Sequence, residues 1–187
     1  MAAKYSFYQL RVAMQQHMIV SLYAEADDPE AFISGFVEAV TKRHVLLWTL
    51  TPWGQPDGWC LRRTEDVMQV FIGDDTEIRL QMLLDIEGVT HTPLLPEAFD
   101  AEDDILRGVL QWALCAGEII SIDTAEDMFT GTVSNVNDLY VTMEIFGFFG
   151  KPEGSRQFPI RELQMVTIDS QEEKMYERLN RLQKEEE

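Results

Sequence analysis

Positively charged residues are scarce in this chain of 187 residues. Fifteen lysines and arginines stand against 33 aspartates and glutamates, so the formal net charge is −18. A surface of this sign repels phosphate backbones, and the basic footprint of non-specific nucleic-acid binding is missing. RNA therefore stays a possible partner, but the net negative charge disfavours its binding.

Histidine and cysteine are also few. His17, His44 and His91 do not share the spacing of metal ligands, and no cysteine–histidine cluster occurs. Cys60 and Cys115 lie in apolar surroundings and are too few for a disulfide framework. We therefore predict no metal site and no cofactor. We also predict that both cysteines are buried free thiols, in a protein of the reducing cytoplasm.

Long hydrophobic runs and common enzyme motifs are absent from the sequence. No apolar run approaches the roughly 18 residues of a membrane span, and the amino terminus lacks a signal-peptide pattern. The GxSxG, P-loop and GxGxxG patterns are missing. Acid pairs such as Asp74–Asp75 stand at loops or helix starts, where acids favour the helix dipole. The sequence predicts a cytoplasmic protein without membrane contact, catalytic residues or enzymatic activity.

An internal repeat is the most informative feature that the sequence does contain. Residues 32–83 align with residues 128–179 at a constant offset of 96, and 11 of the 52 pairs are identical. Average residue usage gives roughly three identities by chance. Upstream, MIVSL at 18–22 matches EIISI at 118–122. The identical pairs are Gly35/Gly131, Val37/Val133, Val40/Val136, Val45/Val141, Gly54/Gly150, Pro56/Pro152, Gly58/Gly154, Val70/Val166, Ile72/Ile168, Glu77/Glu173 and Leu83/Leu179.

Each copy has the same order of expected elements. A helix is predicted around residues 7–14 and again around 105–114, because apolar residues recur three and four positions apart. Five short strands follow, one of them with a glycine where a strand must bend. A closing helix begins at a capping box in each copy, Asp74 with Glu77 and Ser170 with Glu173. Asp100 is the predicted N-cap of the helix that opens the second copy.

This order predicts a mainly β protein with flanking helices (α+β). We expect two tandem SH3-like five-stranded barrels, each preceded and followed by a helix. The expected boundaries are 1–88 for the first barrel, 89–100 for a proline-containing linker, and 101–187 for the second.

Two segments of each copy resemble the motifs of the Sm-like (LSm and Hfq) family. FTGTVSNVNDLYVTMEI at 129–145 is similar to the first motif and FPIRELQMVTI at 158–168 to the second. Their counterparts in the first copy are residues 32–50 and 61–72. The resemblance implies ring-forming oligomers that hold RNA near the turns of the two motifs. The positions that it implies for RNA contacts are Asn135, Asn137, Asp138 and Arg161.

The residues themselves point to a different candidate site, in the first copy. The basic doublets Lys42–Arg43 and Arg62–Arg63 stand at turns, where they pair with acids or contact an anion or partner. Tryptophans flank the first Gly-X-Pro-acid-Gly turn and phenylalanines flank the second, as core packing or as an exposed contact patch. The second copy lacks Trp59, Arg62 and Arg63. The predicted partner or ligand site is therefore Trp53, Trp59, Arg62, Arg63, Lys42 and Arg43.

Three functions are compatible with these features. The leading one is a non-catalytic tandem Sm-like protein that acts through protein–protein contacts as a homo-oligomer or with a protein partner. The alternative is an RNA-binding Sm-like protein of the riboregulatory kind. The third, motivated by the charge of −18, is an acidic mimic of nucleic acid.

Overall fold

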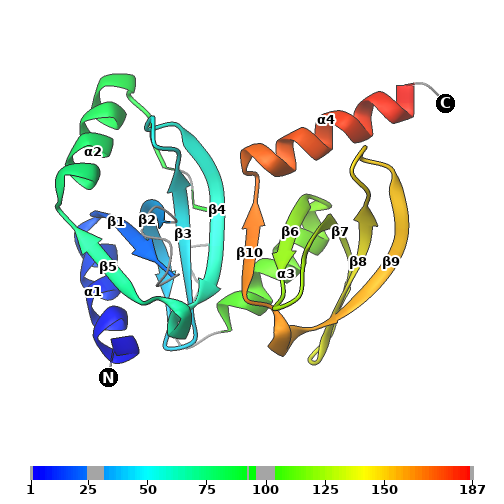
Figure 1. The fold of residues 1–187 in the computed structure, drawn as a ribbon, viewed down its shortest axis with the longest axis horizontal. Coiled ribbons are helices and arrows are strands. Elements are labelled where there is room, and N and C mark those ends of the chain that lie inside the picture. Colours follow the sequence, from blue (N-terminus) through cyan, green and yellow to red (C-terminus); the bar gives the residue numbers. More distant parts are fainter. Residues whose placement is uncertain (1, 25–31, 92, 96–103, 186–187) are drawn as a thin grey trace. The chain divides into compact units, whose positions relative to one another are not determined.

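The computed structural model describes residues 2–24, 32–91, 93–95 and 104–185 (Figure 1). The chain divides into two compact units, Met1–Ile105 and Leu106–Glu187. Within the described ranges, no helix is both long and apolar enough to cross a membrane. The N-cap predicted at Asp100 lies outside the described residues, as do residues 25–31 and half of the predicted linker.

Both units have the same order of elements: a helix, four strands, a short 3-10 turn, a fifth strand and a second helix. In the first unit these are α1 (Ala2–Gln16), β1 (Ile19–Tyr23), β2 (Phe32–Val40), β3 (His44–Leu50), β4 (Pro56–Arg63), η1 (Thr64–Asp66), β5 (Gln69–Ile72) and α2 (Asp75–Glu87). In the second unit they are α3 (Ile105–Ala116), β6 (Ile119–Asp123), β7 (Met128–Val136), β8 (Tyr140–Phe146), β9 (Pro152–Pro159), η2 (Ile160–Glu162), β10 (Met165–Ile168) and α4 (Gln171–Glu185).

The predicted mainly β fold with flanking helices is confirmed, but the prediction of two closed five-stranded barrels is wrong. The described strands form an antiparallel sheet with an open order, β5-β1-β2-β3-β4 in the first unit and β10-β6-β7-β8-β9 in the second. Within each unit the two outermost strands do not pair with each other. Closure depends on strand tilt and register stagger, and an apolar pattern with one bending glycine fixes neither.

The second strand of each unit has a β-bulge and a close backbone contact at equivalent positions. A β-bulge shifts the register between Val37 and Ala39 in β2 and between Val133 and Asn135 in β7. The backbone also comes unusually close at a glycine of this strand. A Cβ at Gly35 would lie 2.1 Å from the Trp48 carbonyl oxygen. The corresponding distance at the equivalent glycine of β7 is 2.0 Å.

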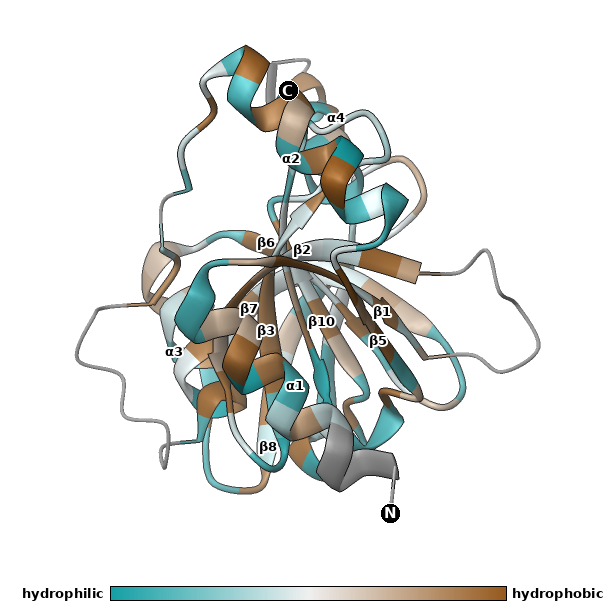
Figure 2. Ribbon diagram, turned by 90° about the vertical axis from the view of Figure 1, so that its left-hand side faces the viewer, coloured by the Kyte–Doolittle hydropathy of each residue, from teal (hydrophilic) through white to brown (hydrophobic). Residues whose placement is uncertain are grey.

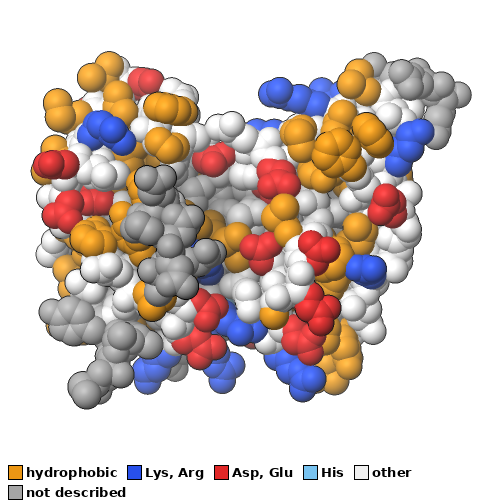
Figure 3. Space-filling view, in the orientation of Figure 1, with side chains coloured by type: hydrophobic (Ala, Val, Ile, Leu, Met, Phe, Trp, Pro, Cys, Tyr) orange, Lys and Arg blue, Asp and Glu red, His pale blue; other side chains and the backbone are white. Residues whose placement is uncertain are grey.

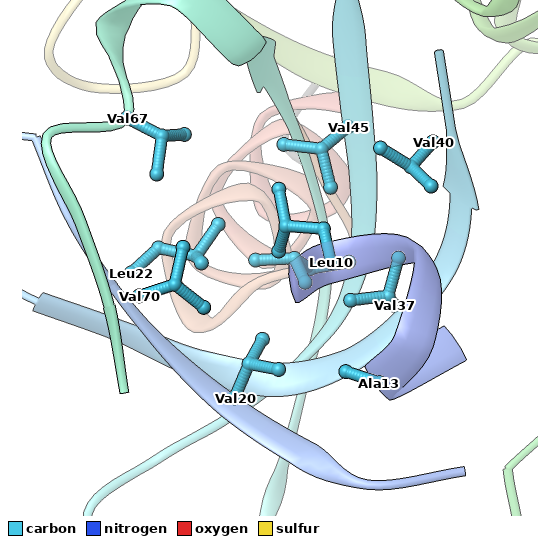
Figure 4. Close-up of a cluster of buried hydrophobic side chains, with 10 residues drawn as sticks. Leu10, Ala13, Val20, Leu22, Val37, Val40, Val45, Val67 and Val70 are labelled. Atoms are coloured by element: carbon cyan, nitrogen blue, oxygen red, sulfur yellow. The ribbon is translucent and has the colours of Figure 1, made fainter. Parts of the chain in front are cut away.

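Helix α1 covers one core of the first unit. Leu10 and Ala13 of this helix are fully buried, and Figure 4 shows them among valine and leucine side chains of the strands. Strands β1 and β3, which supply much of this core, carry brown apolar residues in Figure 2. A second cluster joins helix α2 to the sheet; it consists of Ile19, Trp48, Leu50, Leu80 and Leu84, with Phe36, Trp59 and Val89 packed against it.

A buried glutamate joins the closing helix of the first unit to its strands. Glu77 is 4% exposed and accepts a hydrogen bond from the Asp74 backbone N–H at 2.9 Å, which completes the predicted capping box. Its other carboxylate oxygen hydrogen-bonds to Ser21, and the Ser21 hydroxyl lies 2.8 Å from that of Ser34.

The second unit repeats this network. The Ser170 backbone N–H donates to Glu173 at 2.8 Å, as the second predicted capping box requires. Ser121 and Thr167 also donate to the Glu173 carboxylate, and the Ser121 and Thr130 hydroxyls lie 2.8 Å apart. Each closing helix is therefore fixed to its sheet by a satisfied buried carboxylate.

The prediction of two buried thiols is correct for Cys60, which is buried, and wrong for Cys115, which is exposed.

Candidate functional site

The two basic doublets of the first unit lie at the same end of the sheet. The Thr64 backbone N–H donates to the Arg43 carbonyl oxygen at 2.8 Å, and His44 pairs with Arg63 across β3 and β4. Arg63 approaches Glu65 at 4.0 Å, and Arg62 Nε is buried without a hydrogen-bond partner among the described residues. Lys42 is exposed in the β2–β3 turn. The structure therefore gathers four cations around two neighbouring turns.

His44 reflects this environment. Its pKa is lowered, first because burial disfavours the charged imidazolium and then because the Arg63 and Arg43 charges repel it. Asp104 and Glu65 act in the opposite direction, and their effect does not overcome the burial.

The predicted tryptophans do not join this basic cluster. Trp53 lies in the β3–β4 turn, at the opposite end of those strands, and is 74% exposed. Trp59 lies in β4 opposite Trp48, and its indole Nε1 donates to Glu38 Oε2 at 2.9 Å. The six residues predicted as one site therefore occupy three separate places in the first unit.

The positions implied by the Sm-like resemblance lie near one end of the second unit. The Ile160 backbone N–H donates to the Leu139 carbonyl oxygen at 2.9 Å, so η2 with Arg161 meets the β7–β8 turn. Asn137 Oδ1 accepts hydrogen bonds from the backbone N–H groups of Leu139 and Tyr140, at 2.9 Å each. These bonds shape the turn. Asp138 forms an ion pair with Arg107 of α3.

Asn137 and Asp138 therefore each make contacts that stabilise the second unit itself. Thr41 takes the place of Asn137 in the first unit, and its hydroxyl accepts the equivalent turn N–H groups. Asn135 is exposed on β7, and Arg161 lies 3.6 Å from the Glu162 carboxylate.

A groove in the second unit offers a more complete candidate site. It has a volume of about 440 Å³, within the range of ligand pockets. Its walls come from the start of β7, the end of β8, the following turn, β9 and the first turns of α4. We call it the β8–β9 groove; it is lined by Asp127, Met128, Phe129, Thr130, Ile145, Phe146, Gly147, Phe148, Glu153, Gly154, Ser155, Arg156 and Tyr176.

The first unit fills the equivalent space with apolar side chains. Leu50, Trp59 and Leu80 all belong to or pack against the α2 core cluster. At the offset of 96, these three residues correspond to Phe146, Ser155 and Tyr176 of the groove. Where the first unit has the indole of Trp59, the second has the small hydroxymethyl group of Ser155. Where the first unit has the buried Leu80, the second has the phenol of Tyr176. This polar exchange between aligned positions is the signal in the sequence that points to the second copy rather than the first.

The acids around the groove create a negative potential at its α4 wall. The pKa of Tyr176 is raised by burial and then by the charges of Glu172 and Glu153. The pKa of Glu172 is raised by burial and then by Glu173 and Asp123. Over the face drawn in Figure 3, acidic side chains are interspersed with basic and hydrophobic ones rather than set in an unbroken row.

The groove carries aromatic surface and charge but not a metal-binding arrangement. Among the described residues, no three histidine, cysteine, aspartate or glutamate side chains are grouped so that they could hold a metal ion. For recognition of a ligand, the lining offers aromatic rings, one guanidinium and two carboxylates.

No protein-family model, curated protein or solved structure matches this chain. The resemblance to the Sm-like family stays a prediction that rests on the two motif-like segments of each copy.

Proposed function

We propose that this protein acts through protein–protein contacts and self-associates through strand β9 and the aromatic turn before it. The observation that carries the proposal is the exposed edge of β9. This strand ends the order of the second unit and pairs only with β8 among the described strands. Its residues from Pro152 to Gln157 are all exposed. Unpaired backbone groups along such an edge favour the addition of another strand.

The β8–β9 turn adds apolar anchors beside this edge. Phe148 and Phe149 are 79% and 68% exposed. Their rings are 5.2 Å apart in an edge-to-face arrangement, so they form one continuous aromatic surface. Buried aromatic anchors supply much of the binding energy at protein interfaces.

A second copy of the chain is the partner that we propose. Strand β5 ends the order of the first unit and pairs only with β1 among the described strands. One chain therefore supplies two open edges, and β9 of one copy can add to β5 of another in a head-to-tail contact. We propose the reducing cytoplasm as the compartment, which suits the free thiols of Cys60 and Cys115.

Light scattering coupled to size-exclusion chromatography over a range of concentrations tests the proposal. The wild type is expected to form an oligomer that dissociates on dilution. Phe149→Ser should weaken assembly by about tenfold or more, because it removes an aromatic anchor. Trp53 stands at the equivalent position of the first unit and is also exposed. Trp53→Ser is therefore the matched control and should leave the assembly unchanged. A monomer at every concentration would exclude self-association.

RNA binding is the second candidate, and one observation favours it. Lys42 and Arg43 lie in the β2–β3 turn, and Arg62 and Arg63 end the neighbouring strand β4, in an otherwise acidic protein. Filter binding to U-rich and A-rich RNA at about 0.15 M salt tests it. Binding that Arg43→Gln and Arg63→Gln weaken would support an RNA function, and no retention of either RNA would remove it.

A further inference from the structure

We propose that the β8–β9 groove binds the side chain of an arginine or lysine carried by a basic segment of a protein partner. The choice of a protein as the carrier rests on the proposed function, that the protein acts through protein–protein contacts, and the carrier is a basic partner rather than a second copy of this acidic chain. The choice of a cation rests on the rings and charges of the groove.

Four aromatic rings line the groove: Phe129, Phe146, Phe148 and Tyr176. The face of such a ring attracts a guanidinium or ammonium group, most strongly where water is excluded. The protein already uses this interaction once at the same place. The guanidinium carbon of Arg156 lies over the Phe129 ring, 4.8 Å from its centroid. The remaining rings have no such partner among the described cation–ring contacts.

The charge of the lining residues also favours a cation. Asp127 and Glu153 provide two negative charges against the one positive charge of Arg156, which leaves a net charge of −1. Glu172 adds a further acid next to Tyr176, as the raised pKa of that tyrosine indicates. A cation brought to this wall would therefore be attracted by Glu153 and Glu172 together.

Gly147 holds open the space that the Glu153 carboxylate occupies. A Cβ at Gly147 would lie 2.0 Å from Glu153 Oε1, so any larger residue would displace the carboxylate. The aligned residue of the first unit is Thr51, which carries a Cβ. The glycine is thus coupled to the placement of the acid that we expect to meet the ligand.

A basic partner segment also suits the protein as a whole. The net charge of −18 attracts basic proteins over a long range and speeds their association. A groove of about 440 Å³ is large enough for one long side chain and part of its backbone.

The test is a titration of the full chain followed by NMR of its aromatic and methyl groups. Four probes are compared at constant ionic strength: the peptides Ac-Ala-Ala-Arg-Ala-Ala-NH2 and Ac-Ala-Ala-Glu-Ala-Ala-NH2, tetramethylammonium chloride, and sodium chloride. The arginine peptide is expected to shift the Phe146, Phe148 and Tyr176 signals saturably, with a dissociation constant of about 1 mM. Tetramethylammonium should bind more weakly, and the glutamate peptide should not bind.

Charge variants distinguish a cation site from an anion site. Glu153→Gln should weaken binding of the arginine peptide about three- to tenfold, and Arg156→Gln should strengthen it, since each changes one charge at the groove. Glu177→Gln makes the same charge change on an exposed residue of α4 that does not line the groove, and it should have little effect. Tyr176→Leu installs the residue that the first unit has at this position, so it is expected to fold and to lose binding.

Three results would overturn the inference. The first is binding of the glutamate peptide with loss on Arg156→Gln, which would identify an anion site. The second is saturable binding of tetramethylammonium alone, which would identify a free small cation as the ligand. The third is no saturable shift with any probe. The groove shares Phe148 and part of β9 with the proposed self-association surface, so the titration is also carried out on Phe149→Ser, the variant expected to assemble weakly. A monomeric protein that binds the arginine peptide would reject self-association and keep the groove.

Discussion

The indole Nε1 of Trp59 donates a 2.9 Å hydrogen bond to Glu38 Oε2, and this bond joins strand β4 to the bulge of strand β2. The same carboxylate accepts three further hydrogen bonds from the segment that follows α2. The partners are His91 Nε2 at 3.1 Å and the backbone N–H groups of Leu94 and Leu95 at 2.7 and 3.0 Å. One buried side chain thus holds the start of the connection between the copies against the first unit.

Replacing this carboxylate should release the segment after α2. Glu38 is 7% exposed at its side chain, and Glu38→Ala leaves buried donors without an acceptor. We expect a loss of about 2–4 kcal/mol in the free energy of unfolding. Hydrogen exchange should show loss of protection at the Leu94 and Leu95 amides. Ser134 stands at the aligned position of the second unit and makes one exposed hydrogen bond. Ser134→Ala should therefore cost less than about 1 kcal/mol, and equal costs would contradict this role of Glu38.

The bent strands predict a second mutational effect. Gly35→Ala and Gly131→Ala each place a Cβ about 2 Å from a backbone carbonyl oxygen of the next strand, which cannot move without opening the sheet. We expect each variant to lose at least about 2 kcal/mol of stability in urea denaturation. Gly73→Ala is the control: it has open space around its Cβ and only the strain of a positive φ. A loss at Gly35 no greater than at Gly73 would contradict the close approach.

These glycines also show how far the sequence could predict the fold. Their recurrence at an offset of 96 predicted a bend in the second strand of each copy, and the capping-box spacing predicted the start of each closing helix. Both follow from local chemistry: a missing side chain permits close approach, and a side-chain carboxylate caps nearby N–H groups. Closure of a barrel requires pairing between the two outermost strands of the sheet order, β4 with β5 in the first unit and β9 with β10 in the second. Local patterns do not encode this pairing, and that prediction was wrong.

The candidate site was harder to predict for a similar reason. The absence of Trp59 from the second copy predicts a binding residue, whereas in the structure its ring is partly buried against the α2 cluster and its nitrogen donates a hydrogen bond to Glu38. The aligned residue of the second copy, the small Ser155, is the one that lines an open groove. A sequence comparison shows which residue differs between two copies, but only packing shows whether the larger one fills a core or offers a surface.

The buried glutamates of the two closing helices provide a third prediction. Glu77→Ala and Glu173→Ala each leave a helix N-cap N–H and buried hydroxyl groups without their acceptor. We expect each to cost about 2–4 kcal/mol. Hydrogen exchange should show lost protection mainly in the first unit for Glu77→Ala and mainly in the second for Glu173→Ala. Asp75→Ala changes an exposed acid of the first turn of α2 and should cost under about 1 kcal/mol. An effect of Asp75→Ala as large as that of Glu77→Ala would argue against the buried network.

His44 predicts how stability depends on pH. Burial lowers its pKa in the folded protein, so the unfolded chain takes up a proton at a higher pH than the folded chain does. Stability should therefore fall as the pH drops through the window from about 6.5, the ordinary histidine pKa, to the lower folded value, and it should rise with pH across that window. The groups that face the imidazole are Arg63 and Arg43, which strengthen this effect, and Asp104 and Glu65, which oppose it.

The variant His44→Tyr isolates this contribution, because the second unit has Tyr140 at the aligned position. Urea denaturation of both proteins between about pH 7.5 and pH 5 should show that the wild type loses more stability on acidification than the variant does. The two proteins carry the same carboxylates, so the difference between the two curves reports the removal of His44 and its charge interactions. An NMR titration of the His44 ring should give a midpoint below that of a histidine in an unfolded peptide. A midpoint above it, or a difference that does not change with pH, would show that burial does not govern this histidine.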